Sequence, residues 1–178
     1  MITYLFTVSD ETDRFIGTYT QISASLLDGD KIFVQYDSTN GDSNLLNYLV
    51  NNNIEHIEYP FNNDFSDIKN NAISNVTTKW IIQLEGDDFL ETDFLENIHS
   101  FLNTNSHYDG FCVNRCDFNI DTNENGNVNQ FIRIFKKLPW IQWKGTVHEY
   151  LDGVDMFIEY PYSIRHNRTT QEIEKIYQ

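Results

Sequence analysis

The chain has few cysteines and no long apolar run. Cys112 and Cys116 are its only cysteines, too few for a disulfide framework and compatible with a reducing compartment. No segment approaches the roughly 18 consecutive apolar residues of a membrane span. Residues 1–10, MITYLFTVSD, lack the basic start and long apolar stretch of a signal peptide. These absences predict a cytoplasmic protein without an integral membrane segment.

Basic residues are also scarce. Lys and Arg number 12 against 27 Asp and Glu, which gives a formal net charge of −15 and opposes nucleic-acid binding. A phosphate-bearing substrate would therefore need a cation between itself and the carboxylates. Hydrophobic residues make up 40% of the 178 residues, so we expect one folded domain spanning residues 1–178.

The first half alternates between two hydrophobic periods. Runs rich in β-branched and aromatic residues alternate with segments of helical spacing. Strands are expected at 2–8, 31–37, 54–60 and 80–84, and helices within 15–26, 45–50 and 65–76. This order predicts an α/β fold, a Rossmann-like and mostly parallel central sheet with helices on both faces. Ligands of such sheets bind at the carboxyl ends of the strands.

The pattern changes after residue 90. Residues 92–102 read as a helix with Thr92 as its N-cap. Residues 108–120 and 128–137 then read as strands joined by a polar loop, which predicts a small antiparallel C-terminal part.

Carboxylates follow the fourth expected strand directly. In WIIQLEGDDFL, residues 80–90, Glu85 and Asp87 come two residues apart where the apolar run ends. Carboxylate oxygens suit a hard cation such as Mg²⁺ or Mn²⁺, which could bridge to a diphosphate. The alternative is an acidic strand end that faces water.

Four segments together resemble the family 2 glycosyltransferases of the GT-A fold. IIQLEGDDFLETDFLENI has the strand, acidic motif and helix of that family, with Glu85 in place of its first Asp. FVQYDSTNGDS (33–43) is similar to its second-strand segment, and DFSDIKNNAIS (64–74) to a helix that usually carries Arg where Lys69 stands. FIRIFKKLPWIQWKGTVHEYL (131–151) resembles the pattern of a subgroup with a Val-His-Glu motif.

The resemblance implies an activity and a division of the chain. Residues 1–90 would bind the nucleotide-sugar and residues 91–178 would form the acceptor and catalytic half. The implied reaction is metal-dependent transfer of a sugar from a nucleotide-sugar to a hydroxyl of a carbohydrate or other acceptor. The first donor expected is a UDP-sugar. The implied cofactor is Mn²⁺ or Mg²⁺, and the implied stereochemistry is inversion.

The resemblance also implies roles for particular residues. Glu149 would be the general base, with His148 as the second candidate. Asp87 and His166 would bind the metal. The remaining implied contacts are Thr7, Asp10, Asp37, Lys69 and Glu85 to the nucleotide, and Asp88, Trp143, Lys144, Arg165 and Arg168 to the acceptor or phosphates.

Several of these residues have structural alternatives. Asp37 could open a turn, as Asp often does. His148 and Glu149 could lie at an exposed strand end. His166 could belong to a solvated cluster with its two neighbouring arginines. Trp143, with Trp140, could stack on a sugar or pack in the core.

Two other functions compete with the transferase. Glu85 in place of Asp allows a catalytically weakened nucleotide-sugar-binding or assembly module with the same fold. A nucleotidyltransferase would share the architecture and the metal-bound phosphates. It is disfavoured because no glycine-rich phosphate loop follows the first expected strand.

Two metal-like patterns are interpreted structurally. Residues 121–132 fit part of a calcium loop, but Ile132 stands where its bidentate Glu belongs. We expect a long hairpin turn there. Cys112 and Cys116 lie four apart in an expected strand, about 13 Å from each other, too far to share a zinc ion. We expect free thiols.

Overall fold

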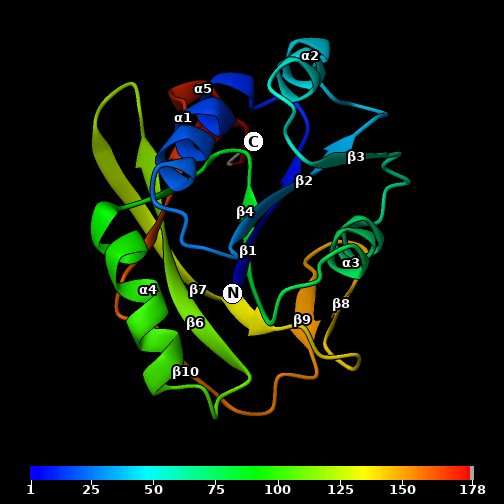
Figure 1. Ribbon diagram of the computed structural model, residues 1–178. Coiled ribbons are helices and arrows are strands. Elements are labelled where there is room, and N and C mark those ends of the chain that lie inside the picture. The colour runs from blue at the N-terminus through cyan, green and yellow to red at the C-terminus, as the bar shows by residue number, and fades with distance from the viewer. Residues whose placement is uncertain (177–178) are drawn as a thin grey trace.

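The structure, a computed structural model, describes residues 1–176 (Figure 1). Its first half alternates strands and helices as the sequence predicts. The strands are β1 (Ile2–Val8), β2 (Lys31–Asp37), β3 (His56–Tyr59) and β4 (Trp80–Glu85), and the helices are α1 (Thr12–Ser23), α2 (Ser43–Asn51) and α3 (Phe65–Ser74). β1 pairs in parallel with β2 and β4, and β2 pairs in parallel with β3. The carboxyl ends of these four strands therefore lie at one edge of the sheet.

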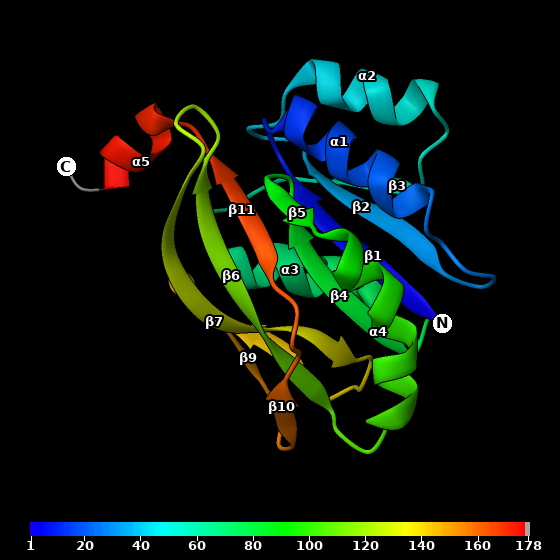
Figure 2. The same ribbon diagram turned by 90° about the vertical axis from the view of Figure 1, so that its left-hand side faces the viewer.

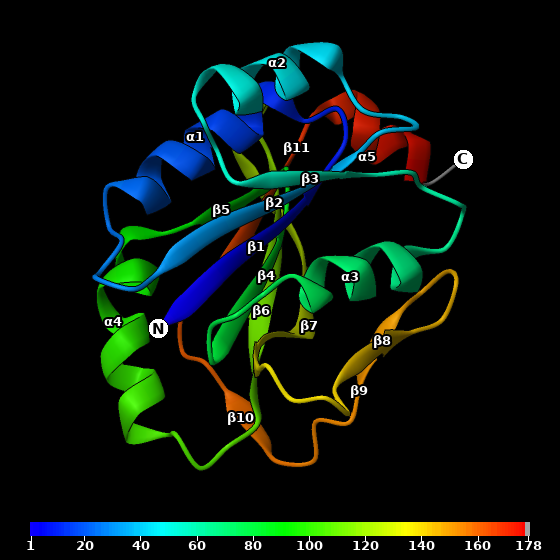
Figure 3. The same ribbon diagram turned by 45° about the vertical axis from the view of Figure 1, so that its right-hand side comes forward.

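Helices cover both faces of the sheet. α1, α2 and α4 (Thr92–Thr104) lie on one side and α3 on the other (Figure 3). The core accordingly has two parts. Phe6, Phe15 and Phe94 belong to the larger cluster, and Leu5 and Ala72 belong to the cluster under α3. The expected mostly parallel sheet with helices on both faces is confirmed.

Aspartates begin two of the helices. The carboxylate of Asp42 accepts a hydrogen bond from the backbone of α2, and that of Asp64 accepts two from the backbone of α3. Such caps satisfy amide groups that have no partner within the helix. The expected N-cap of α4 is wrong by one residue, because Glu91 precedes the helix and Thr92 is its first residue.

The second half extends the same sheet. It contributes β5 (Asp88–Leu90), β6 (Gly110–Asn119), β7 (Glu124–Lys136), β10 (Phe157–Glu159) and β11 (Ile164–Arg168). β8 (Gln142–Lys144) and β9 (Tyr150–Asp152) form a separate small antiparallel sheet, and α5 (Thr170–Ile176) follows β11. The strand order of the main sheet is β3-β2-β1-β4-β7-β6-β11-β5, with β10 paired to β6.

The β6–β7 hairpin confirms the expected antiparallel strands. Its turn occupies only 120–123, and β7 starts at Glu124, so the expected long hairpin turn over 121–132 is wrong and most of that segment is strand. Cys112 and Cys116 lie on β6 as free thiols.

The position of β11 in the main sheet was not predicted from the sequence. It lies between β6 and β5, parallel to the first and antiparallel to the second (Figure 2). This register places His166 opposite both Asp117 of β6 and Asp88 of β5. The end of the chain thereby reaches the acidic turn after β4. Within residues 1–176, no helix is long and apolar enough to cross a membrane.

Candidate functional site

A cavity of about 490 Å³ opens where β1, β2 and β4 end. Residues from both halves of the chain line it. Of the residues singled out from the sequence, the cavity brings together Thr7, Asp37, Lys69, Glu85, Asp87, Glu149, His166 and Arg168. Its volume lies within the roughly 300–1,000 Å³ of small-molecule sites. We term this space the strand-end pocket.

Two contacts constrain the acidic turn after β4. The backbone N–H of Glu85 donates a 2.8 Å hydrogen bond to the carboxylate of Asp88. A Cβ atom at Gly86 would lie 2.7 Å from a carboxylate oxygen of Glu11, so a larger residue would displace that side chain. The turn therefore directs Glu85 and Asp87 into the pocket.

Three cations surround Glu85. Its carboxylate lies 3.2 Å from Lys69 Nζ, 2.6 Å from Arg115 Nη2 and 3.1 Å from Arg133 Nη2. Burial raises the pKa of Glu85, but the charges of Arg133, Lys69 and Arg115 lower it more, so that it lies well below its usual value. Glu85 is therefore an ionised carboxylate, and the three neighbouring cations compensate its negative charge.

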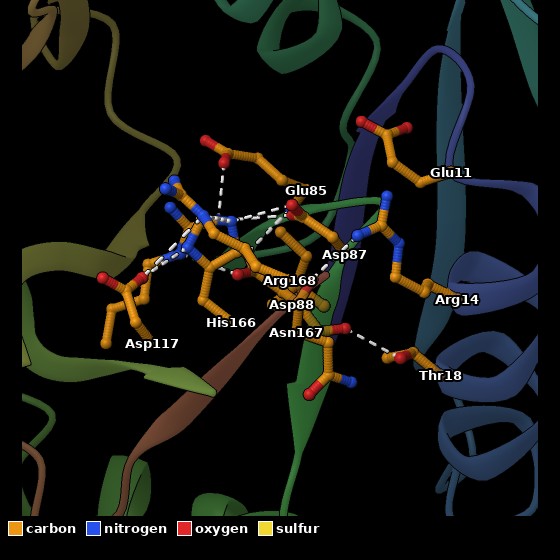
Figure 4. A network of polar contacts seen from close by, with 12 residues as sticks. Glu11, Arg14, Thr18, Glu85, Asp87, Asp88, Asp117, His166, Asn167 and Arg168 are labelled. Atoms are coloured by element: carbon orange, nitrogen blue, oxygen red, sulfur yellow. Dashed lines mark hydrogen bonds and ion pairs between the residues drawn. The ribbon is translucent and has the colours of Figure 1, made fainter. Parts of the chain in front are cut away.

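Asp87 and His166 face each other across the pocket floor. His166 Nε2 lies 2.7 Å from Asp87, and its Nδ1 lies 3.0 Å from Asp117 (Figure 4). Ligand atoms of Glu85, Asp87 and His166 all lie within 4.8 Å of one another. Two carboxylates and an imidazole suit Mn²⁺, and a carboxylate on the second imidazole nitrogen is typical of metal-binding histidines. These residues fit a divalent cation.

Glu149 enters the pocket from the loop between β8 and β9. Its carboxylate lies 2.5 Å from Lys69 Nζ, and the same ammonium lies over the Trp143 ring, 4.7 Å from its centroid. Lys69 is buried, and its ammonium contacts the carboxylates of both Glu149 and Glu85. His148 has a positive φ of 59° and does not line the pocket.

Asp37, the last residue of β2, also lines the pocket. One of its carboxylate oxygens accepts hydrogen bonds from the backbone of Thr39, Asn40 and Phe61, and the other accepts one from the Asn40 side chain. Asp37 therefore shapes the loop after β2, as the turn interpretation expects, and still faces the pocket.

Other residues singled out from the sequence do not line the strand-end pocket. They are Asp10, Asp88, Trp143, Lys144, Arg165 and His148. Trp143 is buried in the core cluster under α3. Lys144 forms an ion pair with Asp152, and the Arg165 guanidinium lies between the rings of Phe89 and Phe118.

Four residues at the site were not expected from the sequence. Arg133 lies within the segment 131–151 that resembles the family, but no role was expected for it, and nothing in the local sequence marked Arg115. Asp117, which contacts His166, and Glu11, which lines the pocket beside Gly86, were also missed.

The geometry can be set beside known proteins. A family model described as Glycosyl transferase family 2 matches residues 26–163, more than half of the chain. No curated protein matches the sequence.

Among solved structures, the fold is similar to that of TarS from S. aureus. One TarS fragment superposes with a TM-score of 0.62 at 10% identity over 97% of this chain and 61% of that one. The fragment in complex with UDP-GlcNAc gives 0.62 at 7% identity over 94% and 59%, and that with UDP gives 0.62 at 8% over 99% and 63%. The chain therefore spans about three fifths of these fragments, and the likeness supports the GT-A fold.

Proposed function

Because the chain belongs to glycosyl transferase family 2, we propose that it moves a sugar from a nucleotide-diphosphate sugar to a hydroxyl acceptor. One observation carries the proposal. Asp37, Lys69, Asp87, Glu149 and His166 come from different elements and line one pocket. Core packing does not require polar groups from five segments to converge at the carboxyl ends of parallel strands, whereas a donor site does.

The donor would lie along the strand-end pocket. Its nucleoside would occupy the end formed by Thr7, Asp37 and Asn40, and its diphosphate would extend toward Asp87 and His166. The solved complexes of TarS contain UDP-GlcNAc and UDP, which supports a UDP-sugar as the first donor to test.

A divalent cation would complete the diphosphate site. Glu11, Asp37, Glu85, Asp87 and Glu149 outnumber the cationic Lys69 and Arg168 in the lining. Arg115 and Arg133 behind Glu85 reduce this excess without removing it. A diphosphate adds further negative charge, so Coulomb repulsion would oppose its binding without a cation. Bound Mn²⁺ or Mg²⁺ would supply charge neutralisation of the leaving diphosphate.

Glu149 would act as the general base. It would accept the proton of the acceptor hydroxyl while that oxygen bonds to the anomeric carbon and the bond to the diphosphate breaks, which inverts the configuration. Lys69 now forms an ion pair with Glu149. The diphosphate would compete for Lys69 and free Glu149 for this task.

Calorimetry tests the donor site. UDP, GDP and CDP are titrated with and without Mn²⁺ into the protein and into Asp87→Ala. We expect Mn²⁺-dependent binding of UDP that Asp87→Ala weakens at least tenfold. Loss of a group that only supports a metal ligand lowers metal affinity about 10–100-fold, and loss of a direct ligand should cost no less. Asp93→Ala is the control, because Asp93 is an exposed carboxylate in the first turn of α4. Absence of binding by every nucleotide would refute the proposal.

A turnover assay separates the transferase from the weakened binding module. The Lys69–Glu149 ion pair is the observation that favours the module, because it occupies the carboxylate that the transferase would need free to contact the acceptor hydroxyl. UDP release from UDP-GlcNAc is measured with Mn²⁺ and a mixture of hydroxyl acceptors. Release that Glu149→Gln abolishes, while UDP still binds at least as tightly because Lys69 is left free for the diphosphate, supports the transferase. UDP binding without release identifies the module.

A further inference from the structure

A second cavity adjoins the strand-end pocket. Its volume is about 240 Å³, and its walls come from three neighbouring strands of the main sheet, β7, β6 and β11. The lining consists of Arg115, Asp117, Asn127, Asn129, Phe131, His166 and Arg168. His166 and Arg168 also line the strand-end pocket, so the two spaces share a wall. We term the second space the hairpin cavity.

The lining residues of the hairpin cavity lie on paired strands at a regular spacing. On each strand they stand two residues apart, as with Arg115 and Asp117 on β6 and His166 and Arg168 on β11. Residues two apart on a strand project to the same side of a sheet. Paired backbones hold the three strands, and contacts of a site built on strands are more precise than those of a site on loops.

The polar groups of the hairpin cavity are balanced in charge. Arg115 is already bonded to Asp88 and Glu85, at 2.7 and 2.6 Å. Arg168 lies 3.9 Å from Asp117, so one cation and one anion remain facing each other in the lining. The chain as a whole carries a net charge of −15. The hairpin cavity does not favour a strongly anionic ligand, because the charges in its lining cancel and the net charge of the chain is negative.

The hairpin cavity also offers an aromatic surface and an amide. Phe131 is 41% exposed, and the guanidinium of Arg133 lies 5.5 Å from its ring centroid. Asn129 is exposed two residues earlier on the same strand. An exposed ring beside planar amide, carboxylate and guanidinium groups can contact the C–H face of a sugar and its hydroxyls together.

We propose that the hairpin cavity binds the acceptor as a neutral sugar unit, a step that rests on the proposed transferase function. The volume of about 240 Å³ lies just below the roughly 300 Å³ of the smallest drug-sized sites, which suits one sugar ring. The shared wall of His166 and Arg168 places this ring next to the residues proposed to hold the cation of the donor site. Phe131 would stack on the ring and Asn129 would bond a hydroxyl.

The test compares variants within β7. Phe131→Ala and Asn129→Ala remove the two proposed contacts, and Val128→Ala is the matched control. Val128 directly precedes Asn129 in β7, is 59% exposed and does not line the hairpin cavity. All three side chains are exposed, so circular dichroism should show folded variants.

Binding is measured by saturation-transfer NMR. The probes are the methyl glycosides of glucose, galactose and N-acetylglucosamine, with glycerol 3-phosphate as an anionic comparison, in the presence of UDP and Mn²⁺. We expect at least one glycoside to bind and its affinity to fall about five- to tenfold in Phe131→Ala and two- to tenfold in Asn129→Ala. Val128→Ala should change nothing.

The outcomes separate this proposal from the transferase proposal. UDP binding that is unchanged in all three variants, together with selective loss of glycoside binding, supports the hairpin cavity. Intact UDP binding with no bound glycoside, with equal glycoside affinity in all variants, or with glycerol 3-phosphate as the only ligand, overturns it alone. Failure of the unmodified protein to bind any nucleotide refutes the donor site instead.

Discussion

Asp88 offers the sharpest test of how the acidic turn is held. Its side chain is buried, with 1% of the residue exposed, and it accepts hydrogen bonds from Arg115 Nε at 2.7 Å and from the backbone N–H of Glu85 at 2.8 Å. Asp88→Ala would leave a buried guanidinium and a backbone donor without this partner. Breaking a buried ion pair from one side costs about 3–5 kcal/mol.

This loss is large enough to measure by thermal unfolding. In a domain of this size, about 4 kcal/mol lowers the Tm by roughly 8–16 °C, at about 2–4 °C per kcal/mol. Asp93→Ala, an exposed carboxylate nearby in sequence, should change stability by less than about 0.5 kcal/mol. A Tm of Asp88→Ala within about 3 °C of the unmodified protein would show that Glu85 and Asp87 suffice to hold Arg115, and would refute the structural role of Asp88.

Three further predictions concern stability. Tyr160→Phe removes a buried 2.7 Å hydrogen bond to the carbonyl of Phe94 and should cost about 1–3 kcal/mol in urea unfolding. Gly153→Ala adds a Cβ 2.4 Å from a backbone oxygen at a φ of +85°, so a loss above about 1–2 kcal/mol is expected, and an unchanged midpoint would contradict this. Although burial raises it, bonds to Arg14 lower the pKa of Glu172 from 4.5 to about 2. The Arg14–Glu172 pair therefore stabilises the fold above pH 4.5 and is lost as the pH falls toward 2. Because Glu172 is 40% exposed, Glu172→Gln should cost less than about 1 kcal/mol at pH 7, and the difference should vanish near pH 2.

Much of the candidate site was predictable because strand ends are marked locally. The apolar run of β4 stops at Glu85, and the run of β2 stops at Asp37, so both residues were expected at the carboxyl edge of one sheet. The pocket lining agrees for both. The roles assigned to them stay predictions until binding is measured.

Residues on short strands and turns were harder to place. Asp88 was expected to contact the acceptor or phosphates, yet it begins β5 and is buried, whereas Asp87 in the preceding turn lines the pocket. Trp143 left two interpretations open, and contacts with Lys69 and the α3 cluster place it in the core. No local pattern distinguishes a buried aromatic residue from one that faces a ligand.

The sequence by itself determined the alternation of strands and helices, the parallel first half and the edge where the carboxylates gather. These features depend on hydrophobic period and strand termination, which are local properties. Only the tertiary structure decided that β11 inserts between β6 and β5, which brings His166 within 2.7 Å of Asp87 across 79 residues of chain. The same insertion creates the wall shared by the two cavities. Strand neighbours so distant in sequence are selected by register and packing, and these exist only once the sheet has formed.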